Sequence, residues 1–73
     1  MKQKLLNEAK SLGFELYQDS SEKWVIKGYR NQKKWLIQEK EEDRWLITIN
    51  GNPQMLIRTR IAISIISNYI DKL

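Results

Sequence analysis

Three segments of the chain repeat one pattern: two polar residues, at least one of them basic, then tryptophan, an aliphatic residue and isoleucine. They are segments 22–26, 33–37 and 43–47, and their tryptophans are 11 and 10 residues apart. Side chains alternate between the two faces of a strand, so each tryptophan shares a face with the isoleucine two positions later. One strand plus one turn takes about 10 residues. The repeats therefore predict three successive strands of an antiparallel meander.

The register of the first predicted hairpin favours this interpretation over a helical repeat of the same spacing. A turn centred on residues 31–32 places Ile26 opposite Ile37. The same turn places Gly28 opposite Trp35, where a large ring benefits from a neighbour without a side chain. The β-branched and aromatic content of the repeats also favours strands over a helix.

The second predicted hairpin keeps the same faces together. A loop over residues 40–44 places Ile37 opposite Ile47. It also places Trp35 opposite Ile49. A slip of one residue in either hairpin would move a tryptophan and an isoleucine to the opposite face, so the sequence specifies the register strongly.

Residues 14–17 alternate apolar and polar side chains and predict another strand ahead of the repeats. A turn over residues 19–22, which are Asp, Ser, Ser and Glu, would return the chain and pair Leu16 with Trp24. The face that the tryptophans share would then form the core. It would carry Phe14, Leu16, Trp24, Ile26, Trp35, Ile37, Trp45, Ile47 and Ile49.

A helix is predicted at the start of the chain, over residues 1–12. Leu5, Ala9 and Leu12 have the i, i+4, i+7 spacing of one helical face. Gly13 follows directly and can adopt the left-handed conformation that commonly ends a helix.

A second, longer helix is predicted from Pro53 to about Lys72. Asn52 is a suitable N-cap residue, and proline is favoured at the first helical position. Apolar residues between Leu56 and Leu73 cover about half of this helix, which is more than one sheet face needs. Arg58 and Arg60 lie near its start, where the helix dipole disfavours cations. They could reach a ligand or pair with acidic side chains, and pairing is preferred.

These elements predict an α+β fold. We expect a two-layer sandwich in which an antiparallel meander of three to four strands is flanked by an N-terminal helix and a longer C-terminal helix, in the order α-β-β-β-β-α. With 73 residues, the chain is expected to form a single domain, residues 1–73.

The composition argues against an enzyme. The chain has no cysteine and no histidine, which removes the usual thiolate nucleophile, the commonest general base and the commonest metal ligand. The acidic segment 39–43 lacks the fixed spacing of a cation site, so a solvated loop is preferred over a metal site or a carboxylate-dependent enzyme. We expect no metal and no cofactor. Because the sequence shows neither a signal peptide nor a membrane-spanning segment, we expect a cytoplasmic protein without membrane contact.

The outer sheet face predicts a protein contact. Val25, Leu36 and Leu46 would form an apolar row there, with Tyr17 beside them. Exposed apolar patches with aromatic neighbours often mark interfaces, although scattered exposed aliphatics are also normal. We therefore predict a small non-enzymatic interaction or regulatory module that binds protein, either a partner chain or a second copy in a homodimer.

The hairpin tip at residues 27–34, called the basic tip below, supports an alternative function. The net charge of the chain is +4, and the basic tip is its most basic local segment. As a nucleic-acid-binding module the chain would contact phosphates and stack an aromatic ring on a base, whereas a solvated turn is the simpler explanation. The tryptophans could also stack on bases, but their phase with isoleucine favours core packing. The residues of this alternative site are Lys27, Tyr29, Arg30, Lys33 and Lys34.

Overall fold

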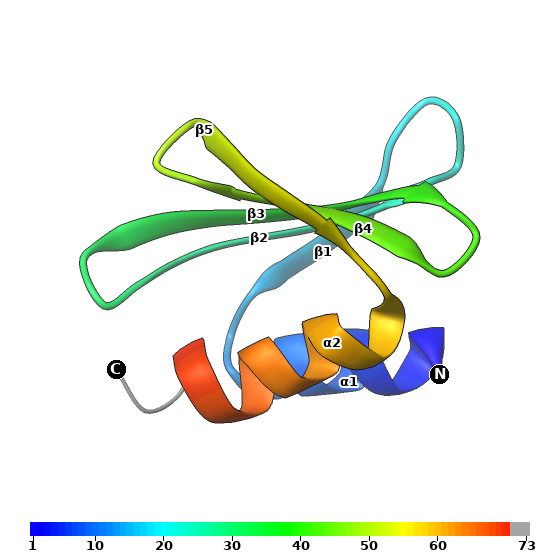
Figure 1. Cartoon of the computed structure of the whole chain (residues 1–73). Helices are drawn as coiled ribbons and strands as arrows, with labels where there is room; N and C mark the ends of the chain where they lie inside the picture. Colours follow the sequence, from blue (N-terminus) through cyan, green and yellow to red (C-terminus); the bar gives the residue numbers. More distant parts are fainter. Residues whose placement is uncertain (71–73) are drawn as a thin grey trace.

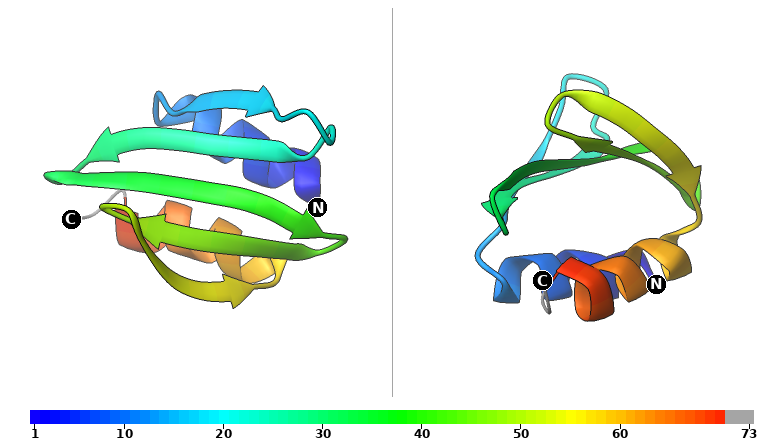
Figure 2. Two further views of the ribbon diagram at one scale, coloured as in Figure 1. Left: turned by 90° about the horizontal axis from the view of Figure 1, so that it is seen from above. Right: turned by 60° about the vertical axis from the view of Figure 1, so that its left-hand side comes forward.

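The computed structural model describes residues 1–70, which form a small α+β fold in two layers (Figure 1). One layer is an antiparallel sheet of five strands in chain order, and the other consists of two helical segments that lie on the same face of the sheet (Figure 2). The elements are α1 (Lys2–Ser11), β1 (Glu15–Gln18), β2 (Trp24–Arg30), β3 (Lys33–Glu41), β4 (Arg44–Ile49), β5 (Asn52–Ile57) and α2 (Thr59–Ser64), which continues into the π-helical turn η1 (Ile65–Ile70).

The register predicted for the three tryptophan strands is confirmed. Ile26 lies opposite Ile37, and Ile37 lies opposite Ile47. Asn31 and Gln32 connect β2 to β3 and both have positive φ, as a type I′ turn requires to match the twist of its strands. The β3–β4 connection is shorter than predicted, because β3 continues to Glu41 through an irregularity in its pairing and β4 starts at Arg44.

The predicted pairing of β1 with β2 is wrong by two residues. Leu16 lies opposite Ile26, not opposite Trp24. A shift by two leaves every side chain on its predicted face, so hydrophobic burial does not choose between the two registers. Hydrogen bonds in the turn favour the observed register. The Asp19 carboxylate accepts from the backbone amides of Ser21 and Lys23, which gives a longer connection than predicted.

The largest correction concerns the segment after β4, which was predicted to begin the last helix. Residues 52–57 form a fifth strand, and the helix starts at Thr59. Asn50 and Gly51 have φ values of 51° and 83° and make a tight hairpin turn, for which Asn-Gly is the strongest short signal. Asn52 pairs with Ile49 and is no N-cap, and Pro53 lies in a strand at the edge of the sheet, where proline is tolerated.

The C-terminal helix is therefore shorter than predicted within the described residues. Its α-helical part, α2, has 6 residues and is followed by 6 in η1, against 10 in α1. The predicted end near Lys72 and the apolar residue Leu73 lie outside the described residues. Within residues 1–70, no helix combines the length and apolar character needed to cross a membrane.

The core lies between the sheet and the helices, on the face that the tryptophans share. Trp35 and Trp45 are buried there as predicted, whereas Trp24 near the end of the sheet is only half-buried. Gly28 lies opposite Trp35 as predicted, but the space above it is filled by another ring: a Cβ there would be 2.6 Å from Cδ1 of Phe14. The buried core consists of Leu5, Leu6, Ala9, Phe14, Ile26, Trp35, Ile37, Trp45, Ile47, Ala62 and Ile66.

Candidate interaction surface

The outer face of the sheet is a surface that the helices leave uncovered (Figure 2). Both helices lie below the sheet in Figure 1, and no other described element lies above it. The strand registers align one outward-facing residue from each of the five strands, and we call this set the central row. Across the sheet from β1 to β5, the central row is Tyr17, Val25, Gln38, Leu46 and Leu56.

The predicted partner-binding residues occupy this face in a different arrangement from the one expected. Val25 and Leu46 are in the central row with Gln38 between them. Leu36 lies in the next row, so the three aliphatic residues surround Gln38 and do not form a line. Diagonal neighbours in a sheet are about 7–8 Å apart, close enough for such side chains to form one patch.

The members of the central row differ in accessibility. Val25 is only 3% exposed, so it supports its neighbours and offers little area to a partner. Leu46 and Leu36 are half-buried. Leu56 at the β5 edge is 54% exposed, and it was missed because its segment was expected to be helical. The Asn-Gly turn was the sequence signal that could have placed it on the sheet.

A shallow depression adjoins this patch on the outer face. Its volume is about 220 Å³, and its lining includes Leu36, Thr48, Lys27 and Lys34. Gly51 contributes no side chain, which leaves that side of the depression open. The lining of the depression is almost entirely apolar, so the two lysines contribute their alkyl chains to it.

The structure separates the five residues predicted for nucleic-acid binding. Strand alternation puts Lys27, Tyr29 and Lys34 on the outer face, and Tyr29 is 69% exposed. Arg30 turns toward the helix side, where its Nη1 donates to the Leu12 carbonyl oxygen at 3.2 Å. Lys33 lies opposite Arg30 and shares that face. The part of the basic tip on the outer face therefore consists of one aromatic ring and two lysines.

At the other end of the sheet, Glu39 has a structural role that the sequence did not reveal. It follows Trp35 and Ile37 on the core face and is 8% exposed. Its carboxylate accepts hydrogen bonds from the Lys2 ammonium and from the Trp24 amide, both at 3.0 Å. Burial alone would raise the pKa of Glu39, but these two donors outweigh it and hold the pKa below its usual value.

Asp43 joins the β3–β4 turn to the start of α2. Its carboxylate accepts from the Thr59 hydroxyl and from the Thr59 amide, the latter at 3.0 Å, and these bonds lower its pKa. Thr59 Oγ1 in turn accepts a hydrogen bond from Trp45 Nε1 at 2.9 Å. Arg58 pairs with Asp43 at 3.5 Å, which confirms the expected pairing for that arginine. Arg44 also approaches the carboxylate, at 3.7 Å.

These contacts give structural roles to Glu39 and Asp43, the first and last residues of the acidic segment 39–43. The two carboxylates with lowered pKa values each bind donors from the chain itself. Among residues 1–70, no three acidic side chains converge in a way that could hold a metal ion.

Comparisons with protein-family models, with curated proteins and with solved structures find no match to this chain. Its function is therefore inferred from its own surfaces.

Proposed function

We propose that this chain is a non-enzymatic interaction module that binds a partner protein on the outer face of its sheet. One observation carries the proposal: the uncovered face bears an apolar patch around Gln38, with Leu46 half-buried near the middle of the sheet and Leu56 exposed at the β5 edge. Apolar surface of this kind is typical of the centre of a protein interface.

The charges beside the patch indicate the chemistry of the partner. Lys27 lies directly opposite Leu36, and Lys34 is two residues before Leu36 on the same face. A partner segment that places an apolar side chain over Leu36 and carboxylates near the two lysines would match both features. Pairing of two copies through this face would instead bring lysines of both copies to one interface, so an acidic partner is favoured.

A nucleic-acid-binding module is the alternative function. It is supported by Tyr29, whose exposed ring lies on the outer face opposite Lys34. A single strand could stack a base on Tyr29 while its phosphates contact Lys27 and Lys34. We rank it second because it uses only one corner of the face and leaves the apolar patch uncovered.

Charge reversal tests the proposal and separates the two functions. The probes are a synthetic peptide in which leucine and glutamate alternate, the same peptide with lysine for glutamate, and a single-stranded oligothymidine. The Lys27→Glu/Lys34→Glu variant should bind the acidic peptide about tenfold more weakly, or weaker still, as measured by calorimetry. Lys4→Glu/Lys10→Glu makes the same charge change on exposed positions of α1 and should leave binding unchanged.

A second substitution distinguishes an apolar contact from simple charge attraction. Leu36→Asn should weaken the binding of the acidic peptide but not the binding of the oligothymidine, because stacking and phosphate contacts do not use this leucine. Binding of oligothymidine that depends on Tyr29 and falls steeply with salt, without binding of the peptide, would favour the alternative function. Equal effects of the two charge-reversal variants would overturn a site on this face.

A further inference from the structure

The depression on the outer face lies beside the two lysines of the proposed partner site. Its lining is almost entirely apolar although it includes Lys27 and Lys34, so these side chains border it with their alkyl chains and hold their ammonium groups beyond the lining. Leu36 and Thr48, which lie opposite each other on β3 and β4, also line it. The depression is therefore an apolar recess with two positive charges nearby.

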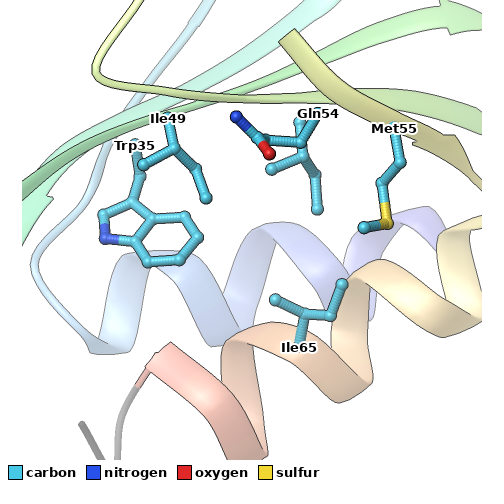
Figure 3. Close-up of a pocket in the computed structure, with 6 residues that line it drawn as sticks. Trp35, Ile49, Gln54, Met55 and Ile65 are labelled. Carbon is cyan, nitrogen blue, oxygen red and sulfur yellow. The ribbon is translucent and has the colours of Figure 1, made fainter. Parts of the chain in front are cut away.

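A larger pocket lies on the helix side of the sheet, but its lining does not indicate an occupant. Its volume is about 400 Å³. In Figure 3, Met55 and Ile49 point from the sheet toward the helix, and Ile65 points back toward the sheet. The residues that line this pocket are apolar except Gln54, whose Nε2 already donates a hydrogen bond to the Asn52 carbonyl oxygen at 3.0 Å. The depression on the outer face, by contrast, has charges nearby that limit the chemistry of what binds there.

The size of the depression favours a ring. Its volume is about 220 Å³, whereas an apolar cavity of about 150 Å³ already takes up a benzene molecule. Gly51 has no side chain to narrow the depression. Aromatic side chains are also enriched in the cores of protein interfaces. An aromatic side chain of a partner therefore fits this recess.

The two lysines favour an aromatic ring over an aliphatic side chain. An ammonium group is attracted to the face of an aromatic ring when it lies within about 6 Å of the ring centre. Lys27 lies opposite Leu36, and Lys34 is two residues before Leu36 on the same face, so the two ammonium groups can approach a ring in the depression from different directions. An aliphatic side chain would make the apolar contact without this attraction.

The surroundings of the two lysines differ, and the difference indicates where a carboxylate of the partner would bind. Lys27 lies opposite Glu15 of β1, so part of its charge is balanced within the chain. Lys34 lies between two neutral residues, Tyr29 on β2 and Asn50 after β4. Two residues along an extended segment span about 7 Å, which is also the spacing of Lys34 and Leu36 along β3. An acidic residue two positions from the aromatic one could therefore reach Lys34.

We propose that the partner binds through an aromatic side chain that occupies this depression and an acidic residue two positions away that pairs with Lys34. The inference rests on the proposed function, because it specifies the partner segment that the outer face recognises. It adds a selectivity for aromatic over aliphatic side chains, which a general attraction between an apolar patch and an acidic segment does not require.

Three peptides test this selectivity on the unmodified chain. The first has phenylalanine at its centre, serine on both sides of it and glutamate at both ends; the second has leucine in place of phenylalanine, and the third has lysine in place of glutamate. In titrations followed by two-dimensional NMR, the phenylalanine peptide should bind about threefold or more tightly than the leucine peptide. The lysine peptide should bind most weakly. Lys34→Glu should weaken the binding of the phenylalanine peptide more than Lys27→Glu does.

A substitution that fills the depression tests where the ring binds. Thr48→Leu places a larger side chain there and should remove the preference for phenylalanine, whereas Thr48→Val keeps the shape and should retain the preference. Circular dichroism checks that both variants are folded, and the peptide comparison on the unmodified chain decides by itself if Thr48→Leu is not. A preference that persists in folded Thr48→Leu would overturn the proposal, because the ring would then bind elsewhere.

The peptide series also separates this proposal from the proposed function. Equal affinities of the phenylalanine and leucine peptides, both reduced by Lys34→Glu, would overturn the aromatic selectivity and leave an acidic partner on the outer face. Absence of binding by both glutamate peptides would overturn the two proposals together. Binding of the oligothymidine in their place would favour the nucleic-acid alternative.

Discussion

Trp45 and Leu46 are neighbours in the chain, yet they point to opposite faces of β4 and have different surroundings. Trp45 is buried beneath the helices, and its ring nitrogen donates a hydrogen bond to Thr59. Leu46 is half-buried on the face that no described element covers. The comparison shows that packing on one face stabilises the fold, whereas apolar side chains on the other face are only partly buried.

Substituting each of these neighbours by alanine should give the largest contrast between the two faces. Trp45→Ala removes a buried ring and the bond to Thr59, and should lower the free energy of unfolding by about 3–5 kcal/mol. Leu46→Ala should lower it by about 1 kcal/mol, because part of the leucine is already in contact with water. Urea denaturation followed by circular dichroism measures both values. Equal losses would mean that the outer face is as important for folding as the core.

Gly28 provides a second test on the core face. Gly28→Ala should cost about 1–3 kcal/mol, because the new methyl group would overlap the ring of Phe14. Combining it with Phe14→Leu should cost less than the sum of the two single changes, since the smaller side chain can move away from the methyl group. Strict additivity in thermal and urea unfolding would show that Phe14 is not the residue that keeps position 28 free of a side chain.

The strand registers that could be predicted from the sequence are those in which a shift of one residue would expose the core. The registers of Ile26, Ile37 and Ile47 follow from the tryptophan repeat, because any odd shift would expose core residues. The predicted core face rests on the same argument. The sequence could also have predicted that the residues of the basic tip lie on both faces of the sheet, since strand alternation separates Arg30 from Tyr29.

The remaining errors occurred where burial does not discriminate between alternatives. The β1 register differs by an even number of residues, and the hydrogen bonds of Asp19 in the turn favour the observed register. In residues 50–53, a hairpin signal overlaps a helix-start signal, and Pro53 is acceptable in both. Leu56 was missed on the outer face for this reason. The role of Glu39 depends on its distance to Lys2 in α1, which local sequence patterns do not contain.

Glu39 is the exception to the contrast between the two faces, because it is a charged group at the end of the core face. Glu39→Gln keeps an oxygen that can accept from the Trp24 amide but removes the charge that attracts Lys2. It should lower the free energy of unfolding at neutral pH by about 1 kcal/mol, a small effect because Lys2 is half-exposed. Glu42→Gln, an exposed position in the same hairpin, is the control and should have no comparable effect.

The pH dependence of this difference identifies its cause. The pKa of Glu39 is lower in the folded chain than its ordinary value of 4.5, so the unfolded chain takes up a proton first as the pH falls. The stabilisation from the Glu39 carboxylate is therefore fully present above pH 4.5 and is lost as the pH falls through the folded pKa. Asp43 loses its contribution with the same sign in both proteins, so the difference between wild type and Glu39→Gln isolates Glu39. Urea midpoints of the two proteins should converge in acid. A difference that stays constant from neutral to acidic pH would mean that Glu39 acts through its shape and not through its charge.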